Sequence, residues 1–231
     1  MDQTDTGPKI GTLQEMSLHA ALKSRLARPG DQFEVEIDGY FIDIVHGELL
    51  IEIQTGNFTA MKNKLGRLLK DHPVCVVYPI ARERWVRRVT ADGDLVSRRK
   101  SPKKGRIEEL FMELVRLPHL VSNPNFFLKA LLIQEEVIWR DDGQGSWRRK
   151  GWSIADRLLL DVLEFVDFAK PADYLTLLPE TLAYPFTNRD LVACLGIQDR
   201  LAQKMTYCLR QMELIEITGK SGRAHLHDKI G

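Results

Sequence analysis

The sequence predicts an α/β protein whose core is a mixed β-sheet, followed by a smaller and mainly helical domain. Three observations lead to this prediction. Short runs that alternate between apolar and polar residues cover residues 32–54, and a continuous apolar run, typical of a strand buried on both faces, covers residues 74–80. From Ser153 onward the apolar spacing becomes helical. We therefore expect a first domain over residues 1–150 and a second over residues 151–231.

The composition is that of an ordinary globular chain. Its 231 residues are 44% hydrophobic and 28% charged, which allows a sizeable buried core. No apolar run reaches the ~18 residues of a membrane span, so no membrane partner is expected. Residues 1–11 lack the basic start and apolar centre of a signal peptide, and Cys75, Cys194 and Cys208 lie far apart in apolar surroundings. These features predict buried free thiols and a cytoplasmic protein, in a bacterial-type cytosol or nucleoid.

The elements of the predicted core follow one another in a simple order. Apolar residues at helical spacing predict an amphipathic helix that begins near Thr12 and ends before Pro29. Three strands connected by tight turns come next, over residues 32–38, 41–45 and 49–55. A second helix covers residues 58–72, and the buried strand 74–80 follows it.

Two of these strands place polar side chains among apolar neighbours. Alternation sends Leu50, Glu52 and Gln54 to one face of their strand, and a hairpin brings Asp43 next to them. Carboxylates inside a sheet are costly unless something compensates their charge. Because a divalent metal with oxygen ligands is a good compensator, the pattern predicts a metal site.

A strongly basic strip covers residues 82–106. It carries ten Lys and Arg residues against three acidic ones, a local net charge of +7 in a chain whose net charge is +1. Its two halves are predicted to be strands joined near Gly93, a hairpin with cationic arms. Such a concentration of charge indicates contact with a polyanion, although a solvated loop is the alternative. The cations expected to contact DNA are Arg84, Arg87, Arg88, Arg98, Arg99, Lys100, Lys103 and Lys104.

The middle of the chain is predicted to alternate between helix and strand. Residues 106–118 are expected to form a helix, and residues 126–142 a long strand, although their apolar spacing also fits a helix. A second cluster of basic and aromatic residues covers 147–152. Residues 153–168 are predicted to form a well-patterned helix with Ser153 as its N-cap.

The last part of the chain resembles a winged-helix domain. The helical run TNRDLVACLG is followed by a second one, IQDRLAQKMTYCLRQMEL, and then by the hairpin IEIT-GKSG-RAHLH, so the match covers residues 186–227. The resemblance implies that the second helix enters the major groove of DNA and that the wing contacts phosphates, although such domains also bind proteins. The residues it implies are Gln198, Arg200, Gln203, Lys204 and Tyr207 on the helix, and Lys220 and Arg223 on the wing.

The first part of the chain resembles the PD-(D/E)XK, or restriction-endonuclease-like, nucleases. An Asp, then eight residues, then Glu-x-Gln lie in the order helix, three strands, helix, strand, and the resemblance covers residues 10–81. It implies a Mg²⁺ ion, with Mn²⁺ as a possible substitute, held by Asp43, Glu52 and the backbone carbonyl of Ile53. It also implies Glu15 as a further acid on the first helix.

One position departs from this resemblance. Most members of the superfamily carry a lysine where this chain has Gln54, and an amide carries no positive charge. Some members use Gln there to position the attacking water, and in others the lysine has moved to the following helix. Lys62, in preference to Lys64, would then supply that charge.

The sequence therefore predicts a metal-dependent DNA endonuclease that could act as a homodimer. A catalytically inactive nuclease fold that binds DNA through its winged helix is one alternative, and a protein-binding module is another. The sequence of DNA that is cut, its structure and the biological pathway do not follow from the fold.

Overall fold

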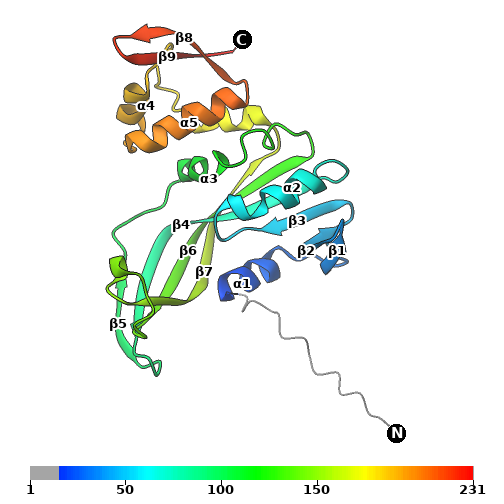
Figure 1. Ribbon diagram of the computed structural model, residues 1–231, viewed down its shortest axis with the longest axis vertical. Helices are drawn as coiled ribbons and strands as arrows, with labels where there is room; N and C mark the ends of the chain where they lie inside the picture. Colours follow the sequence, from blue (N-terminus) through cyan, green and yellow to red (C-terminus); the bar gives the residue numbers. More distant parts are fainter. Residues whose placement is uncertain (1–15, 231) are drawn as a thin grey trace.

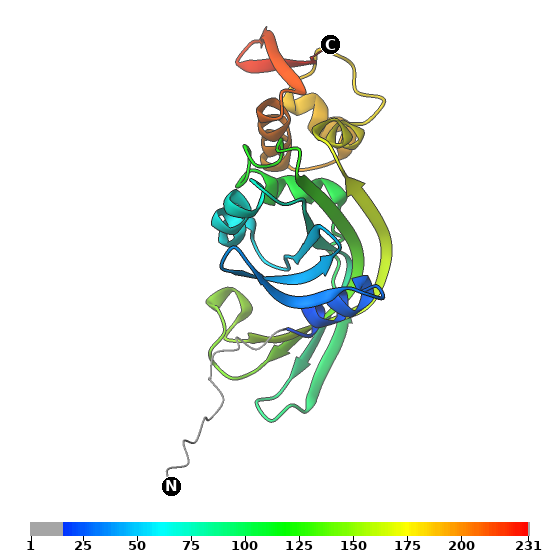
Figure 2. The same ribbon diagram turned by 90° about the vertical axis from the view of Figure 1, so that its right-hand side faces the viewer.

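The computed structural model describes residues 16–230, and most of them belong to or cover a strongly curved, seven-stranded mixed sheet (Figures 1 and 2). The strand order is β1-β2-β3-β4-β6-β7, and β5 pairs with the far half of β4. The strands are β1 (Gln32–Ile37), β2 (Tyr40–His46), β3 (Leu49–Ile53), β4 (Val74–Val89), β5 (Leu95–Lys100), β6 (Phe126–Arg140) and β7 (Ser153–Phe168). Pairs β3/β4 and β4/β6 are parallel, whereas all the others are antiparallel.

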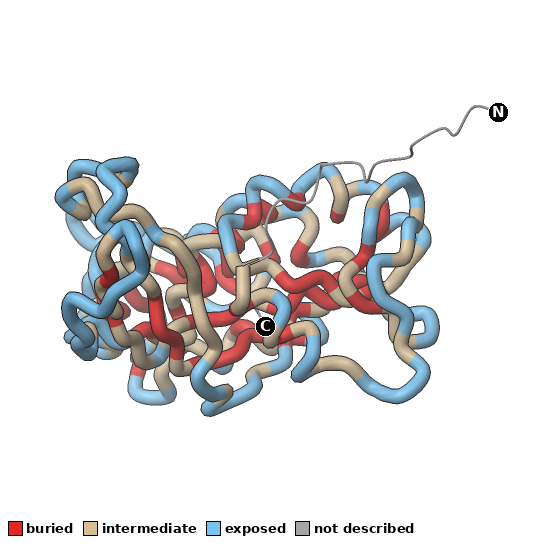
Figure 3. Tube along the Cα trace, turned by 90° about the horizontal axis from the view of Figure 1, so that it is seen from below, coloured by how far each residue is buried: buried red, intermediate tan, exposed pale blue. Residues whose placement is uncertain are grey.

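Helices cover both faces of the sheet. Helix α1 (Ser17–Leu26) lies on one face, where Leu18 and Leu22 pack with Val77 of β4. The neighbouring residue Val76 belongs to the other hydrophobic cluster, as expected when successive strand residues point to opposite faces. The second face is covered by η1 (Phe58–Met61), α2 (Lys62–Leu68), η2 (Ile107–Leu110) and α3 (Phe111–Leu114). Buried residues run along the central strands, and exposed residues gather in the loops around them (Figure 3).

The order predicted for the core is confirmed. A helix, three strands, a helix and a buried strand follow one another over residues 17–80, and the strand predicted for 126–142 is β6. Strand β4 continues beyond the predicted end, through the first half of the basic strip, and pairs there with β5. The helix predicted for 106–118 is wrong in length, because only the short turns η2 and α3 form before Pro118.

The helix predicted for residues 153–168 is wrong, because this segment is strand β7, which pairs with β6 along its whole length. The pairing shifts register at three places, and each shift interrupts the alternation of side chains between the two faces. A strand interrupted in this way has no regular period of two in its sequence, so its leucines fit a helical spacing by chance. Since β7 belongs to the main sheet, the sheet extends past the boundary predicted at residue 150.

The C-terminal unit contains the predicted pair of helices and the hairpin. These are α4 (Asn188–Leu195), α5 (Asp199–Gln211), β8 (Ile215–Ser221) and β9 (Ala224–Lys229), preceded by the turn η4 (Pro171–Leu177). Thr187 caps α4 in a capping box with Asp190, as its sequence indicates, and Gly196 ends it in a left-handed conformation. Cys208 of α5 is buried, as is Cys75, whereas Cys194 is exposed, which corrects its predicted burial. None of the helices in residues 16–230 is long and apolar enough to cross a bilayer.

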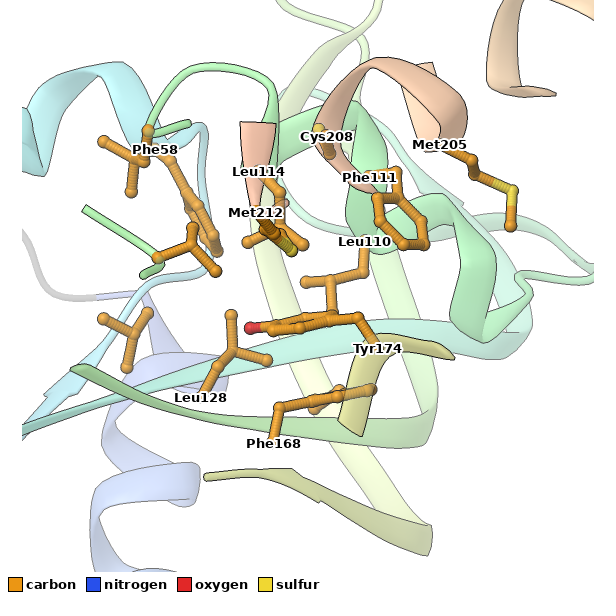
Figure 4. Packing of buried hydrophobic residues seen from close by; sticks show 14 of the residues in the cluster. Phe58, Leu110, Phe111, Leu114, Leu128, Phe168, Tyr174, Met205, Cys208 and Met212 are labelled. Atoms are coloured by element: carbon orange, nitrogen blue, oxygen red, sulfur yellow. The ribbon is translucent and has the colours of Figure 1, made fainter. Parts of the chain in front are cut away.

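The C-terminal unit shares one hydrophobic core with the sheet (Figure 4). The ring of Tyr174 stacks on Phe168 at the end of β7, with ring centroids 4.4 Å apart. Phe111 of α3 lies on its other side, at 6.2 Å. Met205 and Cys208 of α5 pack into the same cluster. The sheet and the C-terminal helices therefore do not have separate hydrophobic cores.

Candidate active site

The two predicted carboxylates lie where β2 and β3 stop pairing. The backbones of these two strands pair from the turn between them as far as Ile44 of β2 and Ile51 of β3. Beyond this pair the amide of Ile53 donates a hydrogen bond to Oδ2 of Asp43 at 2.7 Å. A side chain thus replaces the main chain as the partner of β3, and it fixes the Asp43 carboxylate beside the end of that strand.

Asp43 is held in its charged form. Its Oδ2 lies 3.2 Å from Nε2 of His19, and its Oδ1 lies 3.9 Å from Nζ of Lys23, both on α1. Burial by itself raises the pKa of Asp43, but the hydrogen bonds from His19 and the Ile53 amide outweigh this and hold the pKa below its usual value. The carboxylate is therefore ionised at neutral pH.

Glu52, on β3, has a raised pKa, in contrast to Asp43. Its residue is only 7% exposed, and burial raises the pKa of Glu52 to about 7. The nearby charge of Asp43 contributes to this rise, and the ammonium group of Lys64, 2.6 Å from Oε2, offsets part of it, so a pKa of about 7 is the net result. The other oxygen, Oε1, is buried and has no hydrogen-bond partner within the described part of the chain.

The other predicted catalytic residues differ in their positions. The amide of Gln54 donates to the carbonyl of Asn57 at 2.7 Å, so its NH₂ group faces the loop that follows β3. Lys62 is exposed and lines a groove beside α2, whereas Lys64 contacts Glu52, so Lys64 and not Lys62 is the lysine beside the carboxylate, and the catalytic role of either stays a prediction. Glu15 lies outside the described residues, and the role of the Ile53 carbonyl stays a prediction.

The donor set fits a divalent metal in part. Asp43 and Glu52 are within electrostatic reach of each other, and the unpartnered Oε1 of Glu52 is a buried oxygen without a proton donor. An ion of this kind prefers such oxygens. Residues 16–230 contain no group of three acidic, His or Cys side chains with metal-site geometry, so further ligands would be backbone carbonyls, water or Glu15.

Most cations of the basic strip are paired with carboxylates. Arg84 donates to Glu135, which is 0% exposed, and Arg98 donates to Glu136, both on β6. The remaining pairs are Arg87 with Glu136, Lys100 with Glu83, Lys103 with Glu109, and Arg106 with Glu108. Arg88 lies between the rings of Trp139 and Trp152, and Arg99 and Lys104 are exposed and carry no ion pair among the described residues. Much of the predicted polyanion footprint is therefore neutralised within the sheet.

Sequence reasoning missed three residues of this charge network. Glu135 and Glu136 are buried, and Glu135 also accepts two hydrogen bonds from Arg157 of β7. Two adjacent acids inside an otherwise apolar strand were the available signal, because a buried carboxylate needs a partner. The partner, Arg157, could not be identified because residues 153–168 were predicted to form a helix.

The predicted DNA contacts of the C-terminal unit lie on its surface. Arg200, Gln203 and Tyr207 are exposed on one side of α5, whose other side packs into the core. Lys204 is half-buried beside them, and Lys220 and Arg223 are exposed at the tip of the β8–β9 hairpin.

A cavity of about 600 Å³ opens beyond the end of β3, the strand that carries Glu52. Thr55 and Gly56, which directly follow Gln54, form one of its walls. Tyr78 of β4 and Met112 of α3 line it as well, so it lies on the face of the sheet that α2 and α3 cover. The Glu52 side chain meets Lys64 of α2 on that same face.

Comparisons with known proteins cover both halves of the molecule. A relative, an uncharacterized protein of Treponema pallidum (strain Nichols), is 34% identical over 222 residues, which are 95% of this chain and 87% of the relative. No solved structure matches the chain. A family model described as "Domain of unknown function (DUF8091)" matches residues 16–169, from α1 to the end of β7. The chain therefore belongs to the DUF8091 family.

Proposed function

We propose that the protein is a metal-dependent nuclease that hydrolyses phosphodiester bonds in DNA, with a PD-(D/E)XK-like core and a C-terminal winged helix. One observation carries the proposal. Asp43 and Glu52 come from neighbouring strands to one buried corner, where one carboxylate oxygen has no partner in the described chain. A buried carboxylate oxygen without a hydrogen-bond partner is costly, so its presence favours a functional role.

The residues of this corner have distinct tasks in the proposed reaction. Asp43, fixed by the Ile53 amide, and Glu52 would hold the metal. A bound Mg²⁺ ion lowers the pKa of water and polarises a phosphoryl oxygen. The ammonium group of Lys64, next to Glu52, would stabilise the negative charge that develops on the phosphate. Lys64 of α2 would thus supply the positive charge that the amide at Gln54 does not carry.

A DNA-binding protein without cleavage activity is the second candidate. It is favoured by the Gln54 amide, which donates to Asn57 and faces the loop rather than the carboxylates. It is also consistent with the exposed cations on α5 and on the hairpin tip.

Cleavage assays with matched lysine variants test the proposal. Supercoiled plasmid and branched or single-stranded oligonucleotides are incubated with Mg²⁺, Mn²⁺ or EDTA. Asp43→Asn, Glu52→Gln and Lys64→Ala should each lower the cleavage rate by roughly 100-fold or more, as expected for groups that act on the reacting phosphate. Lys62→Ala, two residues away on the same helix, should keep the rate within about twofold because Lys62 is exposed and lies in another groove.

A binding measurement accompanies the assay. Calorimetric titration with Mn²⁺ should show one site in the wild type and a loss of binding in Asp43→Asn. Lack of cleavage together with lack of Mn²⁺ binding would contradict the nuclease and leave the non-cleaving DNA-binding protein. Equal rates for Lys64→Ala and Lys62→Ala would contradict the role given to Lys64.

A further inference from the structure

The cavity lies beyond the end of β3, the strand that carries Glu52. Gln54 and Tyr78 are adjacent, because the amide of Gln54 pairs with the carbonyl of Val77 in the parallel β3/β4 ladder. Gln54 lies two residues beyond Glu52, about 7 Å along the strand between their Cα atoms, and Thr55 and Gly56 of the cavity wall follow directly. A molecule in the cavity would therefore reach the proposed reaction site with its next bond.

The lining of the cavity suits a nucleotide. Tyr78 and Trp139 supply aromatic surface, and Glu109 and Glu113 supply hydrogen-bond acceptors. Arg84 uses its Nε–H on the buried Glu135, which fixes the side chain and leaves its terminal NH₂ groups to donate to a ligand. The volume of about 600 Å³ lies within the range of small-molecule sites.

All four tryptophans of the chain lie at this end of the sheet. Trp85 and Trp139 are on β4 and β6, and Trp147 and Trp152 are in the loop between β6 and β7. All four contact cations within the protein: Arg88 lies over Trp139 and Trp152, Lys100 over Trp85, and Arg148 over Trp147. Trp147 is nevertheless 83% exposed. Arg149, on the same turn, lines the cavity.

This arrangement favours an unpaired strand over a duplex. A duplex hides its base faces in its own stack, so it can use neither an exposed indole ring nor a nucleotide-sized cavity. A duplex is bound mainly through its phosphates, by cations that are free to meet them. In the basic strip most cations already have carboxylate partners. The exposed aromatic surface is therefore more available for binding a nucleic acid than the cations of the basic strip are.

We infer that the cavity takes one unpaired nucleotide of a single-stranded nucleic acid, and that Trp147 stacks on a base of the same strand. The inference rests on the proposed nuclease and names its substrate class: a single strand, or the single-stranded part of a branched molecule. Arg84 binds the phosphate of the nucleotide in the cavity. The next phosphodiester bond is then presented toward Glu52.

Binding assays in EDTA test the inference without any need for cleavage. Fluorescence anisotropy is measured with the full chain and labelled oligonucleotides of about 12 nucleotides, a length within the usual site sizes of roughly 4–16. DNA and RNA single strands and the matching DNA duplex are compared. Single strands should bind more tightly than the duplex, and Trp147→Ala should weaken their binding about 5- to 100-fold, the usual range for one lost stacking contact.

A matched pair on β7 tests the cavity itself. Ile154 and Leu160 are 43% and 44% exposed, and of the two only Ile154 lines the cavity. Ile154→Trp should fill the cavity and weaken single-strand binding at least about tenfold, whereas Leu160→Trp should leave it unchanged. Thermal unfolding of both variants controls for folding.

The outcomes separate this inference from the proposed function. Duplex binding equal to or tighter than single-strand binding, no binding at all, or equal binding by Ile154→Trp and Leu160→Trp would each overturn it. A chain that cuts duplex plasmid through Asp43 but behaves in one of these ways would still be a nuclease. A chain that binds single strands as described but cuts nothing would retain the inferred site and lose the proposed chemistry.

Discussion

At the scale of single residues, Glu52 combines a large shift of its pKa with a buried position. The usual pKa of 4.5 rises to about 7 in the folded chain. At pH 4 the carboxyl group is mostly protonated in both states. Between pH 4.5 and about 7 this carboxyl group is ionised in the unfolded chain but still protonated in the folded one. The stability that the group contributes in its neutral form is therefore lost as the pH rises through about 7. The loss is on the order of 3 kcal/mol.

Replacing this carboxylate should therefore stabilise the metal-free protein at high pH. Glu52→Gln resembles the protonated form, so its free energy of unfolding should match that of the wild type at pH 4 and exceed it by about 3 kcal/mol at pH 8. Urea unfolding in EDTA at several pH values measures the difference. Adding Mg²⁺ or Mn²⁺ should reduce it at pH 8, because an ion bound only to the folded wild type favours its ionised carboxylate. A difference that does not change with pH would contradict the raised pKa.

The sequence located the carboxylates but not the groups that surround them. The hairpin predicted between the two strands was enough to bring Asp43 beside Glu52. Lys62 and Lys64 flank the buried stripe of α2 on opposite sides, and only the packing of this helix over β3 decides which of them meets Glu52. His19 belongs to α1, whose contact with Asp43 is likewise a result of tertiary packing.

At the scale of elements, the far halves of β4, β6 and β7 are held together by a ladder of charges. Glu135 on the central strand β6 accepts hydrogen bonds from Arg84 of β4 and from Arg157 of β7. Arg157 also donates to the carbonyl of Thr55, so it connects this ladder to the loop after β3. A carboxylate that is fully buried loses far more from the removal of a partner than an exposed one does.

Substitutions in this ladder should act on stability. Arg157→Met should lower the free energy of unfolding by about 2–4 kcal/mol, because it leaves Glu135 with a single cationic partner. Arg99→Met, on the exposed strand β5, should change it by less than about 0.5 kcal/mol. Guanidinium unfolding of both variants gives the comparison. Equal effects would show that the ladder contributes nothing beyond an ordinary surface charge.

Elements with a regular pattern were predictable, and β7 was not. Strand β3 and the helices α4 and α5 keep their period along their whole length, so the sequence predicts their positions. Strand β2 loses its alternation at Asp43, because Ile42 and Ile44 pack in the hydrophobic clusters of opposite faces. The register shifts between β6 and β7 remove this periodic signal from β7. The long apolar strand β6 must pair with another strand on each side, but its sequence does not show which segment of the chain that strand is. Because residues 153–168 were predicted to be a helix instead of strand β7, the domain boundary was also predicted too early, at residue 150.

At the scale of the whole molecule, the sheet and the C-terminal unit depend on each other. The family model ends at residue 169, which suggests an independent domain over residues 16–169. The core does not divide there, because Phe111 and Phe168 pack against Tyr174, and α5 covers the same cluster. A chain that ended at residue 169 would expose these two rings and the apolar residues around them.

A chain of residues 1–169 should therefore fail to fold stably on its own. We expect it to aggregate or to bind a hydrophobic dye, and to lose its cooperative thermal transition, which circular dichroism measures. In the full chain, Met205→Ala should lower the free energy of unfolding by about 2–5 kcal/mol and keep a single transition for the sheet and the C-terminal helices. Tyr207→Ala, on the exposed side of the same helix, serves as the control and should have little effect on stability. A folded, cooperative fragment of residues 1–169, or two separate transitions in Met205→Ala, would mean that the sheet is stable without its C-terminal cover.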